Sequence, residues 1–292
     1  MKKKKITGTD LIVLSFVAAV IIYVLYRLTI GFSYKWNWSV MPQYLFRFDA
    51  ESGHWVPNML INGLLATLRI SIWGTILATL IGIAMGLCRT SRSLFLRLVS
   101  RTYVELIRNI PPLVIIFLFY FFISDQIMPL LGIDYLIESL SNKMEGVMRF
   151  FLADPIYASN FFSALITLSV FEGAYITEIV RAGIQAIERG QWEASYALGL
   201  SRWQQMRHII LPQATTQILP PLGGQFISLV KDSAIVSVIS IQELTFMGTE
   251  LMSGTYLTIE IWIIVTALYL MITLPCSLLV ERLEHYMSRS RA

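Results

Sequence analysis

Long apolar runs constrain this chain more than any other feature of its sequence. A transmembrane helix needs about 20 mostly apolar residues to cross the hydrocarbon core. Six runs meet that length, at roughly residues 11–30, 60–87, 103–123, 160–180, 214–240 and 260–281. Only 14% of the 292 residues are charged, whereas about a quarter is usual in a soluble domain. The sequence therefore predicts an all-α integral membrane protein with about six transmembrane helices.

The distribution of basic residues predicts the orientation of these helices. If the N-terminus is inside, fifteen Lys and Arg fall on inner segments: Lys2, Lys3, Lys4, Lys5, Arg89, Arg92, Arg97, Arg101, Arg181, Arg189, Arg202, Arg207, Arg282, Arg289 and Arg291. Four fall on outer segments: Lys35, Arg47, Lys143 and Arg149. Cytoplasmic loops are enriched in basic residues, so both termini are expected in the cytoplasm. The outer stretch 124–159 is acidic and long enough for a short surface helix.

The first apolar run follows four lysines, a pattern that both a cleaved signal peptide and a retained signal anchor share. The run is long, and no small-residue cleavage site with a polar start after it is evident, which favours a retained helix. In the second run, Gly74, Ala78, Gly82 and Gly86 recur every four residues. Such a stripe of small residues predicts that another helix packs closely against this face.

One polar segment, Gly190–Pro212, interrupts the apolar sequence on the predicted cytoplasmic side. Gln191 to Leu198 suits a short helix that ends at Gly199 in the C′ position. Ser201 and Gln204 have the spacing of a capping box for a second helix, whose apolar face would comprise Trp203, Met206, Ile209 and Ile210. These features predict a compact helix–turn–helix. By local physics alone, a passive amphipathic surface loop fits equally well.

The same segment resembles the EAA loop of ABC importer permeases. Glu193-Ala194-Ser195, Gly199 and Ile209-x-Leu211-Pro212 carry the resemblance at fixed spacing. In that family the loop is a coupling helix that docks in a groove of the cytoplasmic ATP-binding subunit. The resemblance implies seven ATPase-coupling residues: Glu193, Ala194, Ser195, Gly199, Ile209, Leu211 and Pro212. Ser195 replaces the second alanine of the motif and is similarly small.

Three flanking segments narrow the family. The segments that resemble the polar amino acid permeases, in the histidine/glutamine/glutamate uptake branch, are Arg108–Val114, Gly173–Ile184 and Pro220–Ser233. The resemblance covers about 60–282 and implies a core of five spans, so 11–30 is an added helix. The expected segments are an N-terminal region 1–58, a permease core 59–285 containing the coupling loop 186–212, and a tail 286–292. Glu172 departs from the family, in which a small or uncharged polar residue is expected.

The resemblance also implies which molecules work with this chain. The partners would be a cytoplasmic ATP-binding subunit dimer, a second identical or homologous permease, an extracytoplasmic solute-binding protein and membrane lipid, in a bacterial inner membrane. The sequence has no GxxxxGK[ST] motif, so ATP and Mg are expected on the partner ATPase, with no cofactor here. No catalytic, metal-binding or nucleic-acid motif is evident, and His54, His208 and His285 are scattered. The chain is therefore not expected to be an enzyme.

Polar groups within the predicted spans are candidates for the transport pathway or its gate: Glu172, Glu178, Arg181, Gln225, Ser228, Lys231 and Asp232. Charges inside a bilayer usually face a cavity or a partner. Lys231 and Asp232 suit either a pathway or a structural ion pair, and Glu172 is a further candidate partner for Lys231. Glu178 and Arg181, near the inner end of their span, suit either gating or interfacial anchoring.

The expected function is that of a permease subunit for ATP-driven uptake of polar L-amino acids. Two alternatives stay open. In an ion-gradient-driven secondary transporter, Glu172, Lys231 and Asp232 would carry the coupling ions. In a non-transporting assembly subunit, the partner permease would hold the only substrate site. The motifs do not specify which amino acid is transported.

Overall fold

The computed structural model describes residues 8–31, 34–51, 53–130 and 150–289, with isolated positions between 131 and 149. Its contacts divide the chain into two units, Met1–Trp38 and Ser39–Ala292. The first unit contains α1 (Gly8–Gly31), the helix expected at 11–30. Its apolar part, Gly8–Tyr23, is shorter than the long apolar helices of the second unit.

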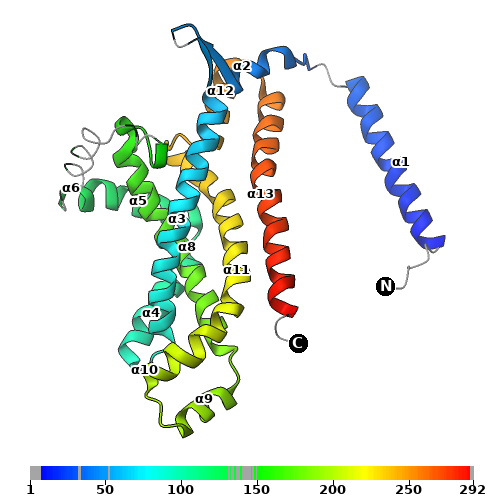
Figure 1. The fold of residues 1–292 in the computed structure, drawn as a ribbon. Coiled ribbons are helices and arrows are strands. Elements are labelled where there is room, and N and C mark those ends of the chain that lie inside the picture. The colour runs from blue at the N-terminus through cyan, green and yellow to red at the C-terminus, as the bar shows by residue number, and fades with distance from the viewer. Residues whose placement is uncertain are drawn as a thin grey trace. The chain divides into compact units, whose positions relative to one another are not determined.

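The second unit is a helical bundle with one small hairpin (Figure 1). After η1 (Trp38–Val40), its described elements are α2 (Met41–Leu45), β1 (Phe46–Asp49), β2 (His54–Pro57), α3 (Met59–Arg89), α4 (Leu94–Asn109), α5 (Pro112–Phe122), η2 (Ile123–Ile127), α6 (Met128–Leu130), η3 (Pro155–Tyr157), α8 (Ala158–Gln185), α9 (Arg189–Ala197), α10 (Arg202–Gln205), η4 (Met206–Ile210), α11 (Leu211–Asp232), η5 (Ser233–Ile239), α12 (Leu244–Thr255) and α13 (Thr258–Arg289). The strands are antiparallel, with Phe46 opposite Pro57.

Four stretches of the described chain are long and apolar enough to cross a membrane: Met59–Arg89, Ala158–Gln185, Arg202–Ile239 and Thr258–Met287. Helix α8 lies at the centre, because 72% of its apolar window is buried, against 11% for the window in α13. Figure 1 shows α9 and α10 at one end of the bundle and α12 with the hairpin at the other. The prediction of an all-α membrane fold is confirmed.

The stripe of small residues on α3 packs against α8, as predicted. Gly74, Ala78, Gly82 and Gly86 are all buried. The approach is closest at Gly82, where an added Cβ would lie 2.4 Å from Ile176 Cγ2. The small residues thus allow side chains of α8 to pack directly against the backbone of α3.

The predicted third span, 103–123, is not one straight helix. Helix α4 begins at Leu94, and the axis turns by 117° between α4 and α5. Ile110, which precedes Pro111, has an extended backbone with φ −101° and ψ 140°, as expected for a residue before proline. The two prolines thus account for the position of the break, whereas its size and the early start of α4 were not predicted.

The predicted fifth span, 214–240, ends differently from expectation. Helix α11 stops at Asp232, η5 continues to Ile239, and an unpredicted helix, α12, follows. Glu243 caps α12, because its Oε1 accepts a hydrogen bond of 2.7 Å from the Phe246 amide. Its Oε2 accepts from the Tyr269 hydroxyl at 2.9 Å, and Thr67 on α3 lies at 3.4 Å from the same oxygen. This buried carboxyl group joins α3, α12 and α13.

Candidate coupling loop and transmembrane polar site

The polar segment forms two short helices joined by a tight turn. Helix α9 ends before Gly199, which has a positive φ of 74°, so the predicted C′ glycine is confirmed. The predicted capping box is also present. Ser201 Oγ accepts from the Gln204 amide at 3.4 Å, and Gln204 Oε1 accepts from the Ser201 amide at 2.8 Å.

The residues of the EAA-like pattern divide into an outward-facing group and an anchoring group. Glu193, Ala194, Gly199 and Pro212 are exposed, whereas Ile209 and Leu211 are partly buried. Ser195 is buried, and its hydroxyl donates to the Trp192 carbonyl at 2.8 Å. Small size at this position therefore has a structural reason within the loop itself.

The predicted apolar face of the second helix is only partly correct. Ile210 is fully buried, but Trp203 is 67% exposed. Residues Met206–Ile210 have π-helical rather than α-helical turns, so the α-helical spacing used for the prediction does not hold here. Leu198, in the turn, is 77% exposed. The loop therefore presents large apolar side chains at its surface.

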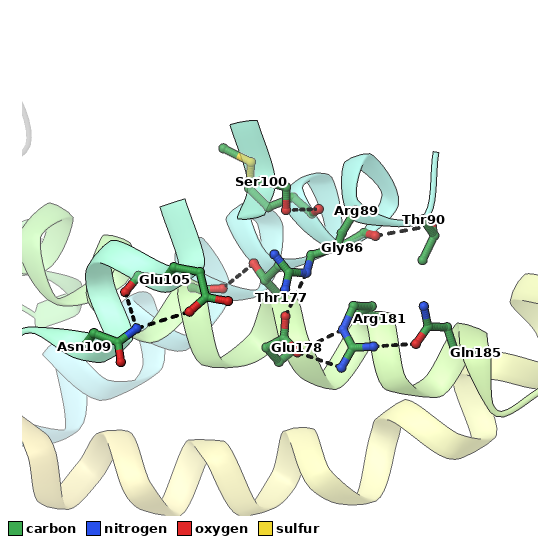
Figure 2. A network of polar contacts seen from close by, with 12 residues as sticks. Gly86, Arg89, Thr90, Ser100, Glu105, Asn109, Thr177, Glu178, Arg181 and Gln185 are labelled. Atoms are coloured by element: carbon green, nitrogen blue, oxygen red, sulfur yellow. Dashed lines mark hydrogen bonds and ion pairs between the residues drawn. The ribbon is translucent and has the colours of Figure 1, made fainter. Parts of the chain in front are cut away.

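A carboxylate on α8 connects this helix with the end of α3 (Figure 2). Glu178 Oε1 lies 3.0 Å from Arg89 Nε. Its Oε2 lies 2.8 Å from Arg181 Nη2, and Arg181 in turn donates to Gln185. The sequence singled out Glu178 and Arg181 but not Arg89, because nothing in a linear sequence places residue 89 beside residue 178.

An open cavity of about 580 Å³ lies between α8 and α11, beside this network. Three of the predicted residues, Glu178, Arg181 and Gln225, line it. Arg108 and Tyr175 also line it, and the Arg108 guanidinium lies 5.4 Å from the centre of the Tyr175 ring. Sequence reasoning did not select Tyr175, since an aromatic residue in an apolar span carries no distinguishing signal.

Glu172 lies deeper in α8 and is fully buried. Its Oε2 accepts a hydrogen bond from Gln225 Nε2 at 2.5 Å, whereas its buried Oε1 has no hydrogen-bond partner among the described residues. The suggested pair between Glu172 and Lys231 is not formed in the described chain. Lys231 is exposed, and its positive charge interacts electrostatically with the adjacent Asp232. Ser228 is partly buried.

Residues 78–291 match the family of binding-protein-dependent transport system inner membrane components. The chain belongs to this family. It is accordingly a multi-pass inner-membrane protein of a transport system.

Curated relatives agree with this family assignment. The glutamine transport system permease protein GlnP of Escherichia coli (strain K12) is 36% identical over 229 residues, which cover 78% of this chain and 93% of that protein. The probable glutamine ABC transporter permease protein GlnM of Bacillus subtilis (strain 168) is 33% identical over 80% of this chain and 95% of that protein. The glutamate/aspartate import permease protein GltK of Escherichia coli O6:H1 is 31% identical over 82% of this chain and 98% of that protein.

A solved structure extends the agreement to the fold. In a crystal structure of an amino acid ABC transporter with histidines, one chain has a TM-score of 0.65 and 32% identity to this chain. The match covers 87% of this chain and 100% of that chain. The residues that match the family, 78–291, lie within the second unit.

Proposed function

We propose that this chain is the permease subunit of an ATP-driven ABC importer for polar L-amino acids. The proposal rests on the family, on relatives named for glutamine and glutamate/aspartate transport, and on the loop. The permease core would be 59–285, with the coupling loop at 186–212. The region 1–58 would add a helix, and 286–292 would be a tail. The chain would pair with itself or a homologous permease and receive substrate from a solute-binding protein.

The single observation that best supports coupling is the exposure of the loop. Leu198 and Trp203 are both more than two-thirds exposed, although they lie in a polar segment at the end of the bundle. Exposed apolar side chains rimmed by polar groups mark protein interaction sites. A cytoplasmic ATPase dimer, carrying ATP and Mg, would cover this surface. Closure of the ATPase dimer on ATP would then switch the pathway to its outward-facing conformation. The residues that transmit this movement would be Glu193, Ala194, Ser195, Gly199, Ile209, Leu211 and Pro212.

The cavity beside Glu178 is the proposed part of the substrate pathway in this chain. Its lining combines the charged groups of Arg108, Glu178 and Arg181 with the amide of Gln225, and an amino acid zwitterion presents both charges in return. Ser228, Lys231 and Asp232 continue the polar groups along α11, and the buried carboxyl group of Glu172 on α8 accepts a hydrogen bond from Gln225 of the cavity lining.

Reconstitution into liposomes tests this function against its alternatives. With the ATPase, the binding protein and internal ATP, and without any ion gradient, uptake of a polar amino acid should proceed. Uptake that requires a sodium or proton gradient and ignores ATP would instead identify a secondary transporter. Substrate bound only in the partner permease would identify this chain as an assembly subunit.

Cysteine labelling tests the proposed topology, with both termini in the cytoplasm. Gln204 is exposed on α10, so a cysteine at this position should react with an impermeant maleimide only from inside. A cysteine at Ser141, which lies outside the described residues, should react from outside. This expectation follows from the excess of basic residues on the predicted inner segments. Reaction of both cysteines from the same face would refute the arrangement.

Lys231→Met tests whether this residue belongs to the pathway. Lys231 is exposed in the single chain and has no ion pair with Glu172. An amine inside a bilayer needs an acidic partner, water or an anionic ligand. A substrate carboxylate meets that need, so we expect uptake to fall at least severalfold while assembly and basal ATPase persist. Lys231→Arg, which keeps the charge, is the control and should retain more uptake. A stable Lys231→Met transporter with normal uptake would contradict the role.

A further inference from the structure

A second cavity, of about 370 Å³, lies where the end of α3 and the start of α4 meet α9 and α10. Four arginines line it: Arg89, Arg97, Arg189 and Arg202, together with Trp192. None of its lining residues is acidic. Such a concentration of one charge is unfavourable unless an anion is present.

Most of this charge is not neutralised by the described protein. Arg89 shares the Glu178 carboxylate with Arg181, and Nη1 of Arg89 is buried without a hydrogen-bond partner. Arg97, Arg189 and Arg202 form no ion pair with the described residues. The Arg202 guanidinium lies 4.4 Å from the centre of the Trp192 ring, which holds its planar donors in place. Arg92 lies near enough to act electrostatically on Arg202 and adds to the positive field.

The donors suit a phosphate group. Guanidinium groups present rigid pairs of N–H donors that match phosphate oxygens, and two or more can bind one phosphate at once. Thr90 and Ser91 also line the cavity, although the Thr90 hydroxyl already donates to the Gly86 and Leu87 carbonyl groups. The cavity therefore offers both charge and directional hydrogen bonds to an anion with several acceptor oxygens.

The surroundings of the cavity favour a lipid phosphate. Arg97 lies on the first turn of α4 between Phe95 and Leu98, which are 71% and 50% exposed. A helix with exposed apolar residues beside arginines is suited to the boundary between headgroups and acyl chains. Basic pockets on the cytoplasmic side of transmembrane helices bind anionic headgroups. We propose that this cavity binds the phosphate headgroup of an anionic phospholipid of the inner leaflet, with an acyl chain along α4.

This inference rests on the proposed function only for the orientation of the chain in the membrane, since α9 and α10 must face the cytoplasm. The lipid would join the α3–α4 turn, through Arg89 and Arg97, to the coupling loop, through Arg189 and Arg202. It would thereby hold the loop in position for the ATPase. The expected consequence is that ATP-driven uptake depends on anionic lipid.

Lipid binding to the intact transporter tests this inference. The complex would be delipidated in detergent and titrated with phosphatidylglycerol or phosphatidylcholine, and retained lipid would be counted by native mass spectrometry. Wild type should prefer phosphatidylglycerol. The double variant Arg97→Gln/Arg202→Gln should bind it roughly 25-fold more weakly, because each basic residue near an anionic surface contributes about fivefold. The matched control Arg101→Gln/Arg207→Gln removes two arginines that do not line the cavity and should keep the preference.

Three results would overturn the inference. An unchanged phosphatidylglycerol preference in Arg97→Gln/Arg202→Gln would exclude the site. Equal displacement of phosphatidylglycerol by inorganic phosphate at matched concentration would indicate a site for a free anion. Loss of the ATPase from this variant with lipid binding unchanged would show that acidic residues of the ATPase occupy the cavity. Because the readout is lipid binding, a failure of amino acid uptake would count against the proposed function and not against this site.

Discussion

Replacing Gly199 by valine should uncouple ATP hydrolysis from uptake while the chain still inserts into the membrane. Gly199 has φ 74°, in the left-handed region where a β-branched residue is strongly disfavoured. An added Cβ would have no atom within 4 Å, so the effect is on the backbone and not on packing. Forcing such a residue there costs about 1–3 kcal/mol. The turn would relax, and α9 would no longer be held against α10.

Two variants isolate this backbone effect. Gly190→Val places the same side chain in the same loop, where an added Cβ also has no neighbour and φ is not positive. This variant should couple ATP hydrolysis to uptake almost as well as the wild type. Gly199→Asn should retain part of the coupling, because asparagine tolerates the left-handed region. The measurements are ATPase stimulation, uptake, and retention of the ATPase during purification. Wild-type uptake in Gly199→Val would refute the role of this turn.

A charge reversal tests the outward face of the same loop. Glu193 is exposed and belongs to no described ion pair, so Glu193→Lys should not disturb the fold of the loop. It would place the opposite charge on the proposed docking face. We expect weaker binding of the ATPase and lower uptake, measured by co-purification and transport. Normal values for both would leave Glu193 without a coupling role.

The sequence predicted the local fold of the polar segment Gly190–Pro212 well because its determinants are local. The Gly199 turn and the reciprocal bonds of Ser201 and Gln204 depend on residues three or four positions apart. Arg89 and Glu178 are far apart in the chain, as are Glu172 and Gln225, and they meet only because α3 and α11 pack on α8. Spacing within one helix cannot reveal such contacts, so the polar site was only partly predicted, and the Glu172–Lys231 pair that the sequence left open is not formed among the described residues.

Hydropathy predicted where apolar helices occur but not where they bend or end. The apolar run at 103–123 contains a 117° turn between α4 and α5. Hydropathy does not detect this turn, because the apolar composition continues through Pro111-Pro112. Helix α12 escaped prediction because it has 12 residues, too few for a span. The N-terminus of α12 depends on the Glu243 cap. In the sequence, Glu243 cannot be told apart from the many other polar residues that could cap a helix. The boundaries of helices thus depended on caps and tertiary packing more than on composition.

Replacing Gly82 by alanine should destabilise the protein far more than the same change at Gly74. The two glycines lie on the same face of α3, two turns apart, and both are buried against neighbouring helices. At Gly82 a Cβ would lie 2.4 Å from Ile176 Cγ2 and 3.1 Å from the Ile176 carbonyl carbon. At Gly74 the nearest atom is Leu229 Cδ2 at 3.4 Å, which is ordinary van der Waals contact at the end of a flexible side chain.

The difference between these two sites isolates the close approach of α3 to α8. Alanine favours a helix over glycine by about 1 kcal/mol, a gain that both variants share. Overpacking costs about 1–3 kcal/mol and applies only at Gly82, because Ile176 cannot withdraw its Cβ or backbone without moving α8. Since Ile176 lies one turn from Glu172 and close to Glu178, that movement would also displace the polar site. Thermal unfolding of the purified complex should therefore show a lower melting temperature for Gly82→Ala and little change for Gly74→Ala. Equal melting temperatures would mean that Gly82 does not set the distance between these helices.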